Sequence, residues 1–99
     1  MKNNDPILVI EDDDVDVLST KRAFKEIGVP NPVVVMKNGE AAMQYLRETT
    51  DRLPGLILLD LNMPKVNGIE FLRSYKQDQR LRWIPAVVLT TSASNRDVL

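Results

Sequence analysis

The sequence of 99 residues contains no cysteine and no histidine. Without cysteine the chain has no disulfide framework and no thiolate site. Without histidine it has no imidazole base and no histidine-ligated zinc. Any metal must therefore be bound by oxygen ligands, which favours magnesium, manganese or calcium.

Net charge is nearly absent as well. The 13 basic and 14 acidic side chains leave a formal charge of −1 at pH 7, which argues against nucleic acid or an anionic membrane as the main partner. No apolar run approaches the length of a membrane span, and the polar residues 1–6 lack the pattern of a signal peptide. We expect one cytoplasmic domain over residues 1–99.

Four short apolar runs alternate with segments of helical period. The runs are residues 7–10, 33–36, 56–59 and 86–89. The intervening segments predict helices at about residues 14–27, at 40–47 and around Ile69, Leu72 and Tyr75. This order is typical of an α/β fold in which helices cover both faces of a parallel sheet.

The pattern also predicts which side chains pack inward. In the first helix these are Val15, Leu18, Phe24 and Ile27, and in the second they are Ala42, Met43 and Leu46. Met36, Met43, Phe24 and Trp83 are interpreted as core or half-buried packing residues rather than as a cofactor pocket.

Polar side chains follow three of the four predicted strands. Glu11, Asp12 and Asp13 follow the first, Asp60 follows the third and Thr90 follows the fourth. Ligands of open parallel sheets bind at the carboxyl ends of the strands. Clustered carboxylates repel one another unless a hard cation is present, so the sequence predicts a Mg²⁺ site. An aspartate beside such a cation can attack phosphorus, and a hydroxyl can bind a phosphoryl oxygen.

Three blocks of the sequence, residues 7–13, 56–64 with Gly68, and 85–90, together resemble the receiver domain of two-component response regulators. The similarity covers essentially the whole chain. It implies a flavodoxin-like, doubly wound parallel sheet with the strand order 2-1-3-4. Residues 38–47 and 81–85 are more specifically similar to single-domain receivers paired with bacterial phytochromes.

The resemblance also implies roles for individual residues. Asp60 would accept a phosphoryl group from a sensor histidine kinase. Glu11, Asp12, Asp60 and the backbone carbonyl of Asn62 would bind Mg²⁺. Thr90 would be the switch hydroxyl that follows the phosphoryl group. Such a domain is a signalling switch read by a partner protein, and not an enzyme beyond self-catalysed phosphotransfer and autodephosphorylation.

The sequence departs from the family pattern at its end. The family continues with a helix, a fifth strand that ends in lysine-proline and a last helix, whereas this chain ends at Leu99. The phosphoryl-contacting lysine of the family is therefore missing. The strand at residues 86–89 is expected to form an exposed apolar edge, and such edges pair with other chains. We therefore expect a dimer or a swapped assembly through this fourth strand.

Simpler interpretations exist for the acidic residues. Asp13 or Asp14 can cap the first helix, Asp16 can be solvated, and Asp12 can be a capping residue instead of a metal ligand. Asp60 can be a turn residue after a strand.

Two other functions compete with the switch. One is a phosphorylation-silent interaction module, which the full acidic triad disfavours; separately, Thr90 can simply end its strand. Alternatively, Asp60 can be the nucleophile of an aspartyl-phosphate phosphohydrolase, although the second acid of that motif is missing.

Overall fold

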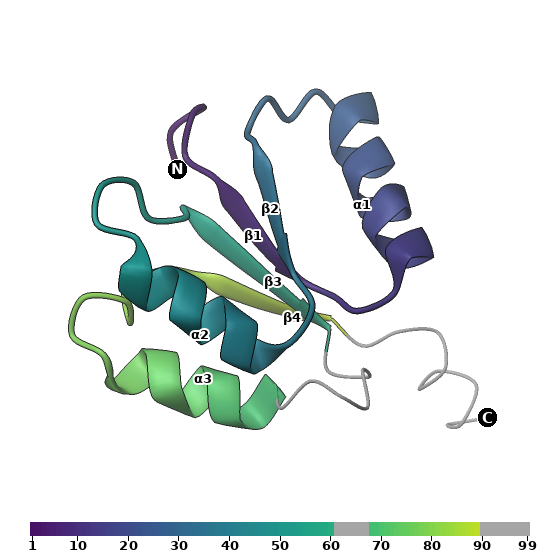
Figure 1. Ribbon diagram of the computed structural model, residues 1–99. Helices are drawn as coiled ribbons and strands as arrows, with labels where there is room; N and C mark the ends of the chain where they lie inside the picture. Colours follow the sequence, from purple (N-terminus) through teal and green to yellow (C-terminus); the bar gives the residue numbers. More distant parts are fainter. Residues whose placement is uncertain (61–67, 90–99) are drawn as a thin grey trace.

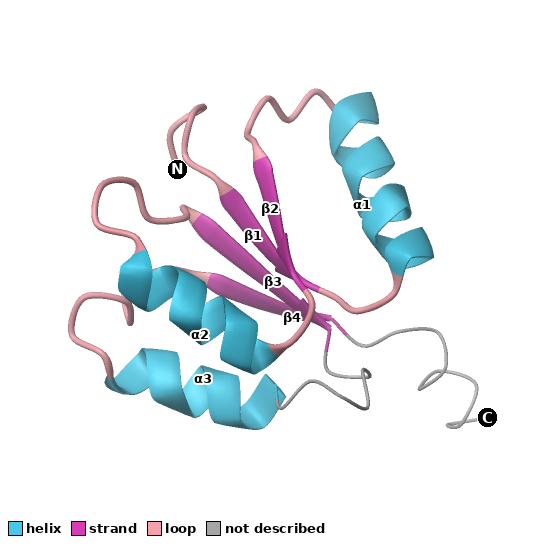
Figure 2. Ribbon diagram, viewed as in Figure 1, coloured by secondary structure: helices cyan, strands magenta, loops and turns pink. Residues whose placement is uncertain are grey.

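The computed structural model describes residues 1–60 and 68–89, and in these ranges four strands alternate with three helices (Figure 2). The strands are β1 (Ile7–Ile10), β2 (Val33–Met36), β3 (Leu56–Asp60) and β4 (Ala86–Leu89). The helices are α1 (Asp14–Glu26), α2 (Gly39–Glu48) and α3 (Gly68–Gln77). The predicted order of elements is confirmed, and the third strand is longer than its apolar run because it includes Asp60.

The sheet is parallel throughout, in the order β2-β1-β3-β4. It lies between α1 on one side and α2 with α3 on the other (Figure 1). This arrangement confirms the predicted doubly wound α/β fold. Within the described residues, no helix combines the length and the apolar character that crossing a membrane requires.

The main core lies between the sheet and the helices α2 and α3. Alternate residues of the two central strands are buried there, namely Leu8, Ile10, Ile57 and Leu59. The helices contribute side chains that recur at helical spacing, namely Ala42, Met43, Leu46, Phe71 and Tyr75. The buried hydroxyl of Tyr75 donates a hydrogen bond to the backbone oxygen of Ile84 at 3.0 Å, so the core leaves this polar atom satisfied.

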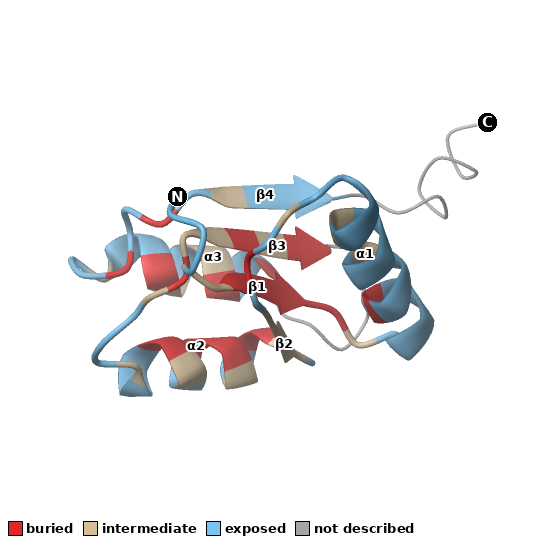
Figure 3. Cartoon of the chain, turned by 90° about the horizontal axis from the view of Figure 1, so that it is seen from above, coloured by how far each residue is buried: buried red, intermediate tan, exposed pale blue. Residues whose placement is uncertain are grey.

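The predicted inward face of α1 is wrong. Val15, Leu18 and Ile27 are 69%, 60% and 73% exposed, while Val17, at 9%, is the one buried residue of this helix. Phe24, seven residues after Val17, is half-buried. Positions seven residues apart share one side of a helix, whereas Val15 and Leu18 lie well away from that side. The apolar residues of α1 thus form no single stripe, and α1 packs on the sheet only narrowly (Figure 3).

Helix α3 packs through Phe71 and Tyr75, whose rings stack with centroids 5.4 Å apart, and Ile69 at its start is 52% exposed. The expectation that Trp83 is a core or half-buried packing residue is wrong. Trp83 is 74% exposed in the connection from α3 to β4. Its ring lies under the guanidinium group of Arg82, at 4.7 Å from centroid to Cζ, and does not enter the core.

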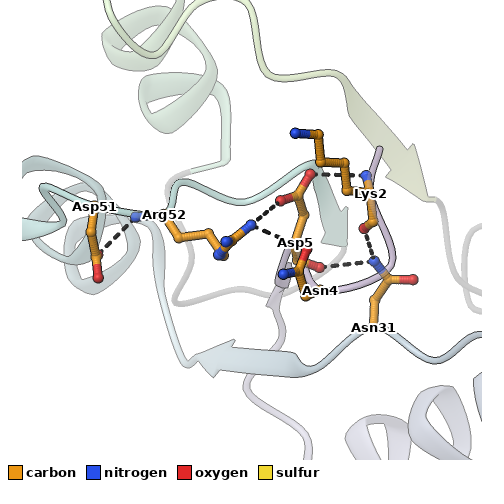
Figure 4. A network of polar contacts seen from close by, with 6 residues as sticks. All are labelled: Lys2, Asn4, Asp5, Asn31, Asp51 and Arg52. Atoms are coloured by element: carbon orange, nitrogen blue, oxygen red, sulfur yellow. Dashed lines mark hydrogen bonds and ion pairs between the residues drawn. The ribbon is translucent and has the colours of Figure 1, made fainter.

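At the amino ends of the strands, a polar network fixes the first residues of the chain (Figure 4). The side-chain amide of Asn31 donates to the backbone oxygens of Lys2 and Asp5 at 2.6 and 2.9 Å. Arg52 donates to the carboxylate of Asp5 at 2.9 Å. The network therefore ties the N-terminal segment to the loops that precede β2 and β3, at the sheet edge opposite the predicted site.

We predict that Leu46→Ala lowers the free energy of unfolding by about 2–5 kcal/mol, because the Leu46 side chain is fully buried between α2 and the sheet. The matched substitution Leu18→Ala, at a 60% exposed position of α1, should change it by less than about 0.5 kcal/mol. Urea denaturation of both variants measures the difference. Equal losses would contradict the packing described for these two helices.

Candidate functional site

The register of the sheet brings Glu11 and Asp60 together. In the pairing of β1 with β3, Ile10 lies opposite Leu59, so the next residues of the two strands, Glu11 and Asp60, are neighbours. Ile10 and Leu59 face the core under α2 and α3. Because successive side chains of a strand alternate between faces, Glu11 and Asp60 point toward the α1 side, at the carboxyl edge of the sheet.

A third carboxylate approaches this pair from α1. Oxygen atoms of Glu11, Asp16 and Asp60 all lie within 4.8 Å of one another. Glu11 and Asp60 are only 7% and 5% exposed, whereas Asp16 is open to solvent. The site is thus a small acidic group with two buried members and one member that solvent can reach.

The N-terminus of α1 positions this group. Asp13 is the N-cap, and its carboxylate accepts from two amides of the first turn at 2.8 and 3.3 Å. Its own N–H donates to Oε2 of Glu11 at 3.2 Å. The capping interpretation is therefore confirmed for Asp13. Asp14 lies one residue inside the helix and pairs with Nζ of Lys37 at 2.6 Å, away from the acidic group.

Burial and mutual repulsion shift the ionisation of the group. Burial raises the pKa of Glu11 from its ordinary value of 4.5 to about 7. The N–H of Asp13 opposes this rise, while the charge of Asp60, a hydrogen bond with Asp60 and the charge of Asp16 increase it. The pKa of Asp16 is also raised, first by desolvation and then by the negative charges of Asp13, Asp60 and Asp12. Without a cation, the group therefore resists full ionisation at neutral pH.

The donor set fits Mg²⁺. Carboxylate oxygens are the ligands that this hard cation prefers, and it usually takes only one or two of them and keeps several waters. A divalent cation would also remove the repulsion that raises the pKa of Glu11. The described residues that could hold it are Glu11, Asp16 and Asp60.

The predicted site residues fall into three classes. The structure brings Glu11 and Asp60 together as expected. Asp12, half-buried between β1 and α1, is not one of the three residues within 4.8 Å, and its role as a ligand stays a prediction. Asn62 and Thr90 lie outside the described residues.

The sequence interpretation expected Asp16 to be solvated, and Asp16 is exposed, but the interpretation missed that its carboxylate lies close to Glu11 and Asp60. One signal was present, because Asp16 follows Asp12 by only four residues and falls in the first turn of the predicted helix. That signal was masked by the general preference of acidic residues for the first turn of a helix.

Comparison with known proteins identifies the class. Residues 7–99 match the family model of the response regulator receiver domain. The chain belongs to this family, and the acidic group lies at the carboxyl edge of a sheet with the strand order that the resemblance implied.

The chain is similar to two regulatory proteins. It is 44% identical over 95 residues to the probable methanogenesis regulatory protein FilR2 of Methanothrix harundinacea, and 40% identical over 98 residues to the response regulator Rcp1 of Synechocystis sp.. These matches include 93% and 94% of this chain, but only 61% and 66% of the relatives. The chain therefore spans less than two thirds of the length of either relative.

Solved structures agree with this assignment. The crystal structure of the phosphorylated cyanobacterial phytochrome response regulator RcpA superposes with a TM-score of 0.78 at 39% identity, and the match covers 96% of this chain and 71% of RcpA. A structure of Rcp1 in its Mn²⁺-bound form also has a TM-score of 0.78, at 38% identity, and the match covers 95% of this chain and 70% of Rcp1.

The raised pKa of Glu11 predicts how stability depends on pH in the presence of a chelator. Between the unfolded value of 4.5 and the folded value of about 7, the folded protein binds more protons than the unfolded chain. The contribution of Glu11 to the free energy of unfolding is therefore present below about pH 4.5 and is lost as the pH rises through about 7. Urea denaturation across this window should give a flatter pH dependence for Glu11→Gln. Identical pH dependence in the two proteins would contradict the shift.

Proposed function

We propose that this chain is a phosphoacceptor signalling switch of two-component phosphorelay signal transduction, which accepts a phosphoryl group on Asp60 from a sensor histidine kinase. One observation carries the proposal: Asp60 is buried at the carboxyl end of β3, with oxygens of two further carboxylates within 4.8 Å, in a chain of the receiver family. An aspartate beside a cation site is the group that such a domain needs as nucleophile.

Different residues of the site have different roles in the phosphoryl transfer. Glu11, Asp12, Asp60 and the backbone carbonyl of Asn62 would hold Mg²⁺, which would supply positive charge that offsets repulsion between carboxylate and phosphoryl oxygens. A carboxylate oxygen of Asp60 attacks the phosphorus of the kinase phosphohistidine, the phosphorus–nitrogen bond breaks and the imidazole leaves. The Mn²⁺-bound form of the relative Rcp1 supports a divalent cation in this family.

The output of the switch is a change of surface. The hydroxyl of Thr90, which directly follows β4, hydrogen-bonds a phosphoryl oxygen and draws the adjoining segment toward the site. This shifts a two-state equilibrium of the surface near β4, which a downstream protein reads in the cytoplasm. The chain turns over no external substrate in this proposal, and its own chemistry is limited to phosphotransfer and autodephosphorylation.

The identity of the kinase that donates the phosphoryl group is a separate question. RcpA is a phytochrome response regulator and FilR2 a probable regulator of methanogenesis, so related receivers serve different signals. The structural similarity to RcpA favours a phytochrome-type sensor kinase, which a phosphotransfer assay with purified kinases can compare with other donors.

Incubation with acetyl phosphate and Mg²⁺, followed by intact mass spectrometry, tests the acceptor. We expect a single phosphoryl adduct that requires Mg²⁺ and is absent from Asp60→Asn. Asp51→Asn is the control, because Asp51 is exposed in the loop before β3, at the opposite edge of the sheet, and should be phosphorylated like the unchanged chain.

Two other results would contradict this assignment of the acceptor. A chain that is folded by circular dichroism but forms no adduct would favour the phosphorylation-silent interaction module. An adduct that persists in Asp60→Asn would place the acceptor at another residue.

We further propose that β4 pairs with a second copy of the chain. Among the described strands, β4 is at the edge of the sheet, and Val87, Val88 and Leu89 are 44%, 40% and 45% exposed. Exposed apolar edges of this kind favour pairing with another strand.

Light scattering at increasing concentration should then give a dimeric mass for the unchanged chain. Val88→Lys should give a monomeric mass, because a charged side chain on an edge strand opposes pairing. A monomeric mass of the unchanged chain at high concentration, with cooperative unfolding, would overturn this proposal.

A further inference from the structure

The acidic group contains one residue to which the receiver resemblance assigns no role. Asp16 lies in the first turn of α1, and its carboxylate comes within 4.8 Å of oxygens of both Glu11 and Asp60. The other two residues belong to the strand ends on which the proposed function rests. Asp16 therefore brings a carboxylate of α1 close to the strand ends that would hold the cation in the proposed function.

We infer that Asp16 is a further residue of the divalent cation site, and that it binds the hydrated cation from α1. This inference deepens the proposed function, because it concerns the same cation site. It assigns to Asp16 a contribution to cation affinity that is separate from the phosphoacceptor role of Asp60.

The approach of Asp16 to the buried pair is fixed by the N-terminus of α1. The backbone N–H of Asp16 donates to Oδ1 of Asp13 at 3.3 Å, and Asp13 in turn donates to Glu11 at 3.2 Å. One residue further on, Val17 is the buried residue of the helix. Capping contacts and a packed neighbour thus hold Asp16 over the carboxyl edge of the sheet on the side that faces Glu11 and Asp60.

The carboxylate of Asp16 lies beside two other carboxylates. Oxygen atoms of Glu11 and Asp60 are within 4.8 Å of its own. Lys37, on the neighbouring strand end, is held by Asp14 at 2.6 Å. A divalent cation placed among Glu11, Asp16 and Asp60 would be attracted by all three carboxylates.

The exposure of Asp16 fits a particular mode of binding. Glu11 and Asp60 are almost fully buried, but Asp16 is exposed, so solvent reaches the group from the side of Asp16. Mg²⁺ gives up its waters reluctantly and is usually bound with several of them retained. The Asp16 carboxylate accordingly accepts hydrogen bonds from waters of the cation, as outer-shell residues of metal sites do, and such residues typically contribute 10–100-fold to affinity.

The test is isothermal titration of the chain with Mg²⁺ and with Mn²⁺, without any phosphodonor. Asp16→Asn should weaken the binding of both cations by about tenfold or more. The matched control is Asp14→Asn, which removes one charge from the same helical turn but from a carboxylate that is directed at Lys37. Screening of this more distant exposed charge should keep its effect within about twofold.

Thermal denaturation supplies a second readout that separates the inference from a folding defect. Without a cation, Asp16→Asn should unfold at the same temperature as the unchanged chain or higher, because the substitution removes repulsion. At equal Mg²⁺ concentration, its gain in stability should be smaller, since the gain follows the affinity. A cation affinity within twofold of the unchanged chain would overturn the inference.

Failure of the inference can be told from failure of the proposed function. If Asp60→Asn abolishes phosphorylation while Asp16→Asn binds cations normally, the switch stands and the role of Asp16 is refuted. If Asp16→Asn weakens cation binding but the unchanged chain takes up no phosphoryl group, the role of Asp16 stands and the switch is refuted. If the unchanged chain binds neither cation, the role of Asp16 is also refuted.

Discussion

The parallel pairing of β1 with β3 is the interaction on which both the core and the site depend. Its register sets Ile10 opposite Leu59, and these two residues close the buried face under α2 and α3. The next residues along, Glu11 and Asp60, turn to the other face and meet there. A slip of one residue would expose the apolar pair and separate the acids, because side chains alternate along a strand. The packed core and the acidic group therefore depend on the same register.

The site opposes the stability that this register provides. Two nearly buried carboxylates, with a third close by, are unfavourable unless protons or a cation reduce their charge. The apolar core on the opposite face compensates for this cost, and the polar network of Asn31 and Arg52 fixes the distant edge of the sheet. The repulsion among these carboxylates thus acts at the carboxyl edge of the sheet, and groups with shifted pKa values often gather at functional sites.

Apolar runs of strand length with polar ends predicted the strands and the meeting of Glu11 with Asp60 at their carboxyl ends. The strand order was predicted by the family resemblance, and the structure confirms it. Sequence reasoning failed where the burial of a side chain depends on how much of its helix or loop is covered by the neighbouring element. Leu18 and Trp83 are apolar yet exposed, and no local pattern states how much of a helix or connection the neighbouring element covers. Asp16 was missed for a related reason, since its position over the strand ends depends on how α1 is placed against the sheet.

The narrow packing of α1 has a consequence for local opening. Val17, at 9% exposure, is the one buried side chain of this helix, and even full burial of a valine contributes only about 1.5–3 kcal/mol. Global unfolding of a domain typically requires about 5–15 kcal/mol. The amide hydrogens of α1 should therefore exchange with solvent through partial detachment of the helix, while those of β1 and β3 exchange only when the whole sheet opens. The helix that carries Asp16 is thus expected to open more readily than the central strands β1 and β3.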